Sequence, residues 1–366
     1  MNTIRKNINI TVWRNIYVRD IIKHKYIVAK EKTMKKQYLF TMSSDLNYAN
    51  ERMLVQLKCW LDSPELKKIV LSFGGDLPAE LPIKEKLSWL LEFSDRWDYR
   101  RMQKTQDQKT GENARWKVNS KNITPEQEKA VAEGIFQLGL TGVQIPECKN
   151  FDYVLALGGA RFSCFYRPQY AAELLKYKII KAKEIALLSG MRPILESERE
   201  ATDSYAPQAE TEYDLINSGG EKAFHLKKEY IEERYHNENV NLNWAVRKYL
   251  SDNEISVSSF SGPSSDPENR RANSSDTYKF FLKKKQIQSG SKLLLITSQI
   301  YVPYQQIEAV RTLGIPYGLY IETVGFPIEW GKKLQGMMET ANYLQEIRST
   351  IQAANRFINS VQMGEL

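Results

Sequence analysis

Residues 152–159 read Asp-Tyr-Val-Leu-Ala-Leu-Gly-Gly, a short apolar run that ends in two glycines. A buried strand followed by a tight turn has this pattern. Four further apolar runs follow along the chain, and stretches with helical spacing separate them. Because strands that alternate with helices form a parallel sheet covered on both faces, the sequence predicts an α/β fold with a doubly wound, mostly parallel sheet. The predicted strands span residues 153–157, 184–188, 255–260, 292–296 and 317–321, and the predicted helices span 169–177, 241–250, 275–284 and 304–313.

The pattern divides the chain into four parts. Residues 1–42 form a basic extension that need not be ordered, and residues 43–150 are predicted to be a helix-rich N-terminal subdomain. A Rossmann-like, three-layer α/β domain is expected over 151–326, with the polar stretch 194–239 as an insertion over one edge of the sheet. Residues 327–366 carry apolar side chains every three or four positions, which predicts a long C-terminal helix. Its apolar stripe either closes back on the core or pairs with a second subunit.

Local signals refine the N-terminal part and the insertion. Apolar spacing predicts helices over residues 50–61 and 81–93. Thr124 followed by a proline and two further polar residues supplies an N-cap, so another helix is expected to start there. The β-branched run at 66–73 is predicted to be a strand. Two further predictions are a polar loop at 103–112 and, after a break at Gly219-Gly220, a helix at 223–234.

The positive charge is concentrated at the start of the chain. The sequence has 52 Lys and Arg against 44 Asp and Glu, a net charge of +8. Residues 1–36 hold ten basic and two acidic residues, which already accounts for the whole excess. The remainder is neutral, so nucleic-acid binding by the whole fold is not indicated. No run approaches the ~20 apolar residues of a spanning helix, and we expect a cytoplasmic protein without a membrane span.

Small or polar residues follow each predicted strand. In an open parallel sheet, ligands bind outside the carboxyl ends of the strands, where backbone N–H groups, hydroxyls and arginines can receive an anion. The sequence therefore predicts a pocket for a phosphate or a nucleotide, although glycine after a strand also serves simply to make the turn. The run from Asn269 to Tyr278 can likewise be an ordinary helix cap. The expected ligand-binding residues are Gly158, Gly159, Arg161, Ser189, Gly190, Arg192, Arg271, Asn273, Thr277, Thr297, Ser298 and Gln305, and the catalytic candidates are Asp276 as general acid or base, Tyr301 and Glu322.

Several common site types are absent from the sequence. It contains no Gly-x-Gly-x-x-Gly, no Gly-x-x-x-x-Gly-Lys-Ser/Thr and no Gly-x-Ser-x-Gly. Standard dinucleotide binding, P-loop chemistry and an α/β-hydrolase nucleophile are therefore disfavoured. The three cysteines form no Cys-x-x-Cys pair and the three histidines are scattered, so no metal site is predicted.

The order of these motifs resembles a known family. Asp152–Gly159, Ile185–Gly190, Arg271–Thr277 and Leu293–Ser298 occur in the order found in the SanA/YdcF/ElyC-like family, over about residues 152–314. The resemblance implies a Rossmann-like domain that binds a nucleotide-like or phosphorylated ligand, with S-adenosylmethionine or a polyprenyl phosphate as candidates. It implies no particular reaction. Where members of that family commonly carry a histidine, this chain has Tyr301.

Three functions follow from these observations. The first is a soluble enzyme, a hydrolase or transferase, that acts on a nucleotide-like or phosphorylated small molecule. The second is a non-catalytic sensor of a nucleotide or S-adenosylmethionine, which signals through the C-terminal helix or the insertion at 194–239. The third is a protein that uses its basic extension on nucleic acid or a membrane surface. A homodimer through the C-terminal helix is compatible with the first two.

Overall fold

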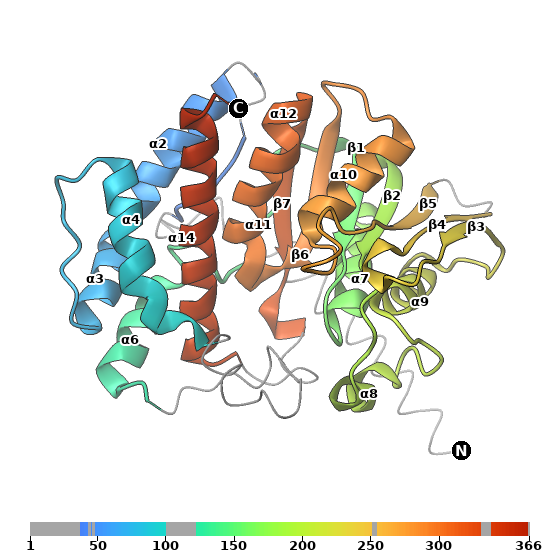
Figure 1. Ribbon diagram of the computed structural model, residues 1–366, viewed down its shortest axis with the longest axis horizontal. Coiled ribbons are helices and arrows are strands. Elements are labelled where there is room, and N and C mark those ends of the chain that lie inside the picture. Colours follow the sequence, from blue (N-terminus) through green and yellow to red (C-terminus); the bar gives the residue numbers. More distant parts are fainter. Residues whose placement is uncertain are drawn as a thin grey trace. The chain divides into compact units, whose positions relative to one another are not determined.

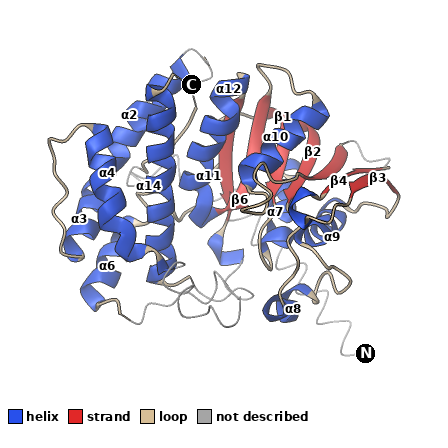
Figure 2. Cartoon of the chain, in the orientation of Figure 1, coloured by secondary structure: helices blue, strands red, loops and turns tan. Residues whose placement is uncertain are grey.

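A seven-stranded sheet, red in Figure 2, has the strand order β3-β4-β5-β2-β1-β6-β7 (labelled in Figure 1). Five strands run parallel and two, β3 and β4, join one edge in antiparallel fashion. This is the α/β, mostly parallel sheet that the sequence predicts. The strands are β1 (Asn150–Leu157), β2 (Lys181–Ser189), β3 (Tyr230–Tyr235), β4 (Trp244–Tyr249), β5 (Ser256–Ser261), β6 (Lys292–Ser298) and β7 (Tyr320–Phe326).

The computed structural model describes residues 37–42, 45, 48–99, 122–250, 255–330 and 338–364. Residues from Tyr38 to Leu366 cluster as one compact unit (Figure 1). Most of the predicted basic extension and the predicted loop at 103–112 lie outside the described residues. The end of that extension is part of the core instead, because Phe40 and Met42 are buried.

Helices cover both faces of the sheet, in the doubly wound manner that the sequence predicts. On one face α7 (Ser163–Lys176) and α9 (Glu212–Phe224) pack against each other and on the central strands. On the other face α10 (Ser274–Lys285) packs on β5 and β2, and α11 (Val302–Ala309) packs on β7 and β6. The parallel strands are therefore buried on both sides, which explains why they read as continuous apolar runs.

The order of the parallel strands reverses between β1 and β6. Across the sheet the five parallel strands follow the order β5, β2, β1, β6, β7. From β1 the chain therefore first adds strands on one side and then, from β6 on, on the other side. The connection after β1 crosses one face and the connection after β6 crosses the other, so the loops after these two strands diverge. In open α/β sheets such a switch point is where ligands bind.

The insertion differs from its prediction. It contains α8 (Glu196–Thr202), α9 and β3, and the predicted helix at 223–234 is wrong because α9 ends at Phe224. Gly219 does not break the chain but lies inside α9. A Cβ at Gly219 would lie 2.0 Å from the carbonyl oxygen of Cys164, so glycine allows α9 to approach α7 closely.

Two other local predictions are wrong for identifiable reasons. Residues 66–73 are not a strand but most of α3 (Pro64–Ser72), whose N-cap Ser63 accepts from the Leu66 N–H and which has proline at its first position. Residues 241–250 are not a helix but contain β4, whose inward positions include Arg247. The other N-terminal helices are as predicted: α2 (Ala49–Leu61), α4 (Ile83–Phe93) and α6 (Pro125–Gly134), with a 3-10 turn η2 (Ser94–Trp97) after α4.

The C-terminal helix α14 (Thr340–Gln362) lies between α4 and α11 (Figure 1). Its apolar stripe, including Leu344, Ile351 and Phe357, is fully buried against the chain's own helices. Arg348 fixes it to η2 through Asp95 (2.9 Å) and the Ser94 hydroxyl (3.1 Å). Of the two alternatives, the stripe therefore closes back on the core. A homodimer through this stripe is not what the structure shows, because its side chains are already covered.

Within the described ranges, no helix is both long and apolar enough to cross a membrane.

Candidate functional site

The glycine turn after β1 lies against the end of β2. A Cβ at Gly158 would lie 2.6 Å from the Ser189 Cβ and 2.8 Å from its Cα, so a side chain is excluded there. The Gly158 N–H donates to the carbonyl of Leu188. Gly158 is thus required for the close approach of two strand ends. A Cβ at Gly159 would lie 3.0 Å from Arg167 Nη1, which places this turn directly beside a guanidinium.

Arg167 connects the two loops of the switch point. It lies in α7 and is 5% exposed. Its Nη1 donates to the carbonyls of Leu157 (2.9 Å) and Gly158, at the end of β1, and its Nη2 donates to Ser298 Oγ (3.1 Å), at the end of β6. Its Cζ lies 5.9 Å from the ring centre of Tyr301. A buried positive charge therefore lies between the carboxyl ends of β1 and β6.

A second set of contacts joins the end of β2 to α10. The Thr277 hydroxyl donates to the carbonyl of Ser189 at 3.4 Å. On the next residue of α10, the Tyr278 hydroxyl donates to Gln305 Oε1 at 3.0 Å. Loops that follow β1, β2, β5 and β6 thus meet at one edge of the sheet. We call Gly158, Gly159, Arg167, Ser189, Thr277, Ser298 and Tyr301 the switch-point cluster.

Some hydroxyls at this edge are buried without a hydrogen-bond partner. They are Ser189 Oγ, Ser261 Oγ and Thr297 Oγ1. A Cβ at Gly190, which follows Ser189, would meet only the backbone nitrogen of Arg192, at 3.9 Å. A ligand or ordered water that reaches Ser189 would satisfy a buried group that the protein leaves unpaired.

The guanidinium of Arg192 is paired with two carboxylates of the protein. Its Nη1 and Nη2 donate to the two oxygens of Glu198 (2.6 and 3.0 Å), and its Nε donates to Glu212 (3.1 Å). Burial disfavours its charge, but the two carboxylates outweigh burial and raise its pKa. Its role is to hold the starts of α8 and α9 to the loop after β2. The expectation that Arg192 holds a ligand anion is not what these contacts show.

Asp276 and Asn273 form a helix cap rather than an exposed acid. Asn273 Oδ1 accepts from the Asp276 N–H (3.1 Å), and Asp276 accepts in return from the Asn273 N–H (2.9 Å). Arg270 Nη1 lies 2.5 Å from Asp276 Oδ2. Burial raises the pKa of Asp276, but the hydrogen bonds from Arg270, Asn273 and Ser265 more than offset this and leave the pKa below its ordinary value. An ionised carboxylate with both oxygens engaged is a poor general acid, so the geometry favours the capping interpretation.

The other two predicted arginines, Arg161 and Arg271, differ in exposure and backbone. Arg271 is exposed, and its neighbour Arg270 makes the ion pair with Asp276. Arg161 has a left-handed backbone (φ 51°), and its carbonyl accepts from the Tyr205 hydroxyl at 2.6 Å.

Glu322 lies away from the carboxyl edge. It is inside β7, where it pairs in register with Leu294 of β6, because β7 begins three residues later than predicted. Its oxygens accept from the N–H groups of Glu147 (2.8 Å) and Cys148 (2.9 Å), which precede β1. Burial is the largest effect on its pKa and raises it. Glu322 is therefore on the opposite half of the sheet from Ser298, and the prediction that it follows the last strand is wrong.

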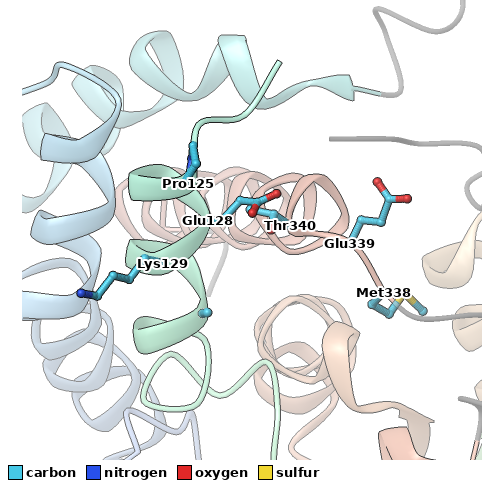
Figure 3. A pocket seen from close by; sticks show the side chains of 7 residues that line it. Pro125, Glu128, Lys129, Met338, Glu339 and Thr340 are labelled. Atoms are coloured by element: carbon cyan, nitrogen blue, oxygen red, sulfur yellow. The ribbon is translucent and has the colours of Figure 1, made fainter. Parts of the chain in front are cut away.

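Two hollows lie elsewhere in the described structure. One, of about 80 Å³, runs beside β7 and is lined by Glu322, Thr323 and Gln306 among others. The other is an open groove of about 500 Å³ between α6 and the start of α14 (Figure 3). In that groove Glu128 points toward Thr340, whereas Lys129 points away. No residue of the switch-point cluster lines either hollow.

Sequence reasoning missed Arg167. It lies two residues before the predicted helix 169–177, whereas α7 in fact begins at Ser163 and contains it. The available signal was its place shortly after the Gly158-Gly159 turn, near the start of the helix that begins at Ser163.

Fold and strand-end geometry define a Rossmann-like α/β protein with an added helical layer. Residues 45–139 match the Rv3785 N-terminal domain. The uncharacterized proteins Rv3785 of Mycobacterium tuberculosis and Mb3814 of Mycobacterium bovis are each 32% identical to the chain over 325 residues, which is 84% of this chain and 89% of each relative. The chain belongs to the Rv3785 family. No solved structure matches it.

Proposed function

We propose that the chain binds a phosphorylated or nucleotide-like small molecule at the switch-point cluster and acts on it as a hydrolase or transferase in the cytoplasm. The observation that carries this proposal is the position of Arg167. Its guanidinium lies between the ends of β1 and β6, where the strand order reverses. A buried positive charge beside a glycine turn favours an anionic ligand.

Two further observations support the ligand class. The hydroxyl of Ser189 is buried and unpaired beside the turn, and a Cβ at the next residue, Gly190, would meet no atom closer than 3.9 Å. The resemblance of residues 152–314 to the SanA/YdcF/ElyC-like family implies the same kind of ligand, with S-adenosylmethionine among the candidates.

A non-catalytic sensor is the alternative. It is favoured by the state of Asp276, whose oxygens serve the cap of α10 and whose pKa lies below its ordinary value. If the protein is instead an enzyme, Tyr301 is the catalytic candidate that remains in the cluster. A sensor would transmit occupancy through the elements attached to the cluster, and α11 connects it directly to α14.

A thermal-shift panel tests the proposal. The probes are ATP, S-adenosylmethionine, glucose 6-phosphate and inorganic phosphate. A ligand that binds only the folded state at a hundred times its Kd stabilises it by about 2.7 kcal/mol, which raises Tm by several degrees. The compounds are tested up to about 10 mM, on the order of the Kd of a weak ligand. If none of them raises Tm, the proposal is contradicted.

Two variants locate the binding and separate the alternatives. Ser298→Ala removes one hydroxyl from the cluster and should reduce the shift, whereas Lys181→Ala, an exposed change at the amino end of β2, should not. Product formation from the shifting compound is then followed by chromatography. The enzyme predicts turnover that Tyr301→Phe slows while the shift remains, and the sensor predicts a shift without turnover.

A further inference from the structure

The two edge strands of the sheet differ in their exposure to solvent. Every residue of β7, at one edge, is buried. At the other edge β3 is exposed along almost its whole length. Three of its six side chains are large and apolar, with exposed fractions of 41% for Tyr230, 61% for Ile231 and 44% for Tyr235. An edge strand with exposed apolar side chains is a template for pairing with another strand.

The residues that present their backbone to the free edge can be identified. The Leu250 N–H donates to the Glu229 carbonyl at 2.8 Å, so this cross-strand pair is a hydrogen-bonded one. Because hydrogen-bonded pairs alternate along an antiparallel ladder, residues 231, 233 and 235 face β4 with their N–H and C=O groups. The groups of Tyr230, Glu232 and Arg234 therefore point outward.

A second copy of β3 complements this edge in one register. An antiparallel pair about a two-fold axis keeps equivalent faces together only when the axis passes through a residue. An axis at Glu233 places Glu232 opposite Arg234 of the other copy twice, and Ile231 opposite Tyr235 twice. The remaining like-charge pair, Glu233 with itself, is relieved by Lys284, whose Nζ lies 2.9 Å from Glu233. An axis at Glu232 instead places Ile231 opposite Glu233. It also places Glu232 opposite Glu232 of the second copy.

We propose that the chain forms a two-fold dimer in which β3 pairs with β3 of a second copy about Glu233, so that the two sheets become continuous. Glu232 and Arg234 then exchange backbone hydrogen bonds across the axis, and their side chains, which pair with each other at 2.9 Å within the strand, lie beside the same pair of the second copy. The exposed side chains Val240 and Leu250, next to β3, extend the apolar contact beyond the strand. Two paired strands bury a small area, so the dimer is reversible and depends on concentration.

Charged residues on an edge strand ordinarily protect it from pairing. Glu232, Glu233 and Arg234 would serve that purpose if their charges opposed every register. In the register about Glu233, Glu232 faces Arg234 twice and the one like-charge pair, Glu233 with itself, lies beside Lys284, whereas the register about Glu232 offers no opposite-charge pair to Glu232, which favours the first of the two. The ordinary interpretation therefore predicts a monomer, and the proposal predicts a dimer of defined register.

Cross-linking tests the register. A non-hydrogen-bonded pair has its Cα atoms about 4.5 Å apart, within the range that a disulfide spans. In a background of Cys59→Ser and Cys148→Ser, with the buried Cys164 retained, Glu233→Cys should form a disulfide-linked dimer on mild oxidation. Ile231→Cys is the matched control, on the same strand and face, and its two copies would lie about 13 Å apart. Equal cross-linking at both positions, or none at Glu233→Cys, would overturn the proposal.

Sedimentation of the unmodified chain provides a second, independent readout. The proposal predicts a concentration-dependent mass that rises toward twice 42.4 kDa. Arg234→Glu places like charges opposite each other and should shift the equilibrium to monomer by at least tenfold in Kd, with an unchanged circular dichroism spectrum. A monomer at all concentrations, or a dimer that Arg234→Glu leaves intact, would overturn it.

Discussion

Arg167 and Arg192 belong to loops or helices that follow neighbouring parallel strands, yet their surroundings differ. Arg192 is held by two carboxylates, Glu198 and Glu212, and thereby fastens two helices. The described hydrogen bonds of Arg167 go to uncharged oxygens, two carbonyls at the end of β1 and the hydroxyl of Ser298. An arginine at the carboxyl edge is therefore not by itself a ligand residue. What distinguishes the two is the kind of partner that the structure describes for each, carboxylates for Arg192 and carbonyl and hydroxyl oxygens for Arg167.

The largest expected effect is on stability at Arg192. Arg192→Met leaves Glu198, which is fully buried, without its bidentate partner. Removing one partner of a buried ion pair costs about 3–5 kcal/mol, because the other charge remains buried and unpaired. We expect the free energy of unfolding in urea to fall by about this amount. The exposed Arg271→Met should change it by less than about 0.5 kcal/mol, and a similarly small loss at Arg192 would remove the contrast between the two arginines.

Arg167→Lys should have a mixed effect. Lysine keeps the charge but cannot donate to the end of β1 and to Ser298 together, since its ammonium lacks the planar fork. Loss of hydrogen bonds from a charged donor predicts a decrease of about 2 kcal/mol in the free energy of unfolding. The thermal shift by the panel ligand should be lost as well. A variant that unfolds earlier but keeps the full ligand shift would make Arg167 purely structural, like Arg192.

The pH dependence of stability in Asp276→Asn tests whether the charge of Asp276 serves the helix cap. Because the pKa of Asp276 is lowered in the folded state, its stabilising contribution is complete above the unfolded pKa of about 3.9 and is lost as the pH falls below it. We expect the wild type to be more stable than Asp276→Asn by about 1 kcal/mol at pH 6, with the difference shrinking toward pH 3. Urea titrations at both pH values measure it. A difference that is constant with pH would mean that the charge of Asp276 contributes nothing to the cap.

The smallest effect concerns Ser189. Its hydroxyl is buried and has no partner in the protein, so Ser189→Ala should leave the free energy of unfolding within about 0.5 kcal/mol of the wild type. If the hydroxyl contacts the ligand, the Kd of the panel compound should rise roughly fivefold. Isothermal titration measures this change. An unchanged Kd would place the ligand away from the end of β2.

The sequence was sufficient for the fold class but not for several elements. Continuous apolar runs such as Leu293–Ile296 identify buried parallel strands, because both faces of the sheet are covered. The strand β4 could not be recognised, since the inward-facing Arg247 interrupts its alternation. That arginine is accommodated by an ion pair with Glu232 at 2.6 Å, a residue fifteen positions away. Such long-range compensation leaves no local signal.

The helix α3 was mispredicted for the opposite reason. Its β-branched residues suggested a strand, but Ser63 and Pro64 form a helix start that outweighs their propensity. The burial of Leu66, Ile69 and Val70 at helical spacing confirms that tertiary packing decides this segment.

For the candidate site, the sequence indicated which loops meet but not which side chains pair with one another. The convergence of Gly158, Ser189, Thr277 and Ser298 follows from parallel strands ending at one edge. Whether Arg192 or Asp276 was engaged depended on Glu198 and Arg270, whose positions only the folded chain determines. Arg167 was missed for the same reason.

The most direct measurement is a crystal structure of the chain soaked with the panel compound that gives the largest thermal shift. The account predicts density for its anionic group beside the Gly158-Gly159 turn, within hydrogen-bonding reach of the Ser189 or Ser298 hydroxyl. Density in the hollow beside β7 or in the groove between α6 and α14, with the switch-point cluster left unchanged, would contradict it.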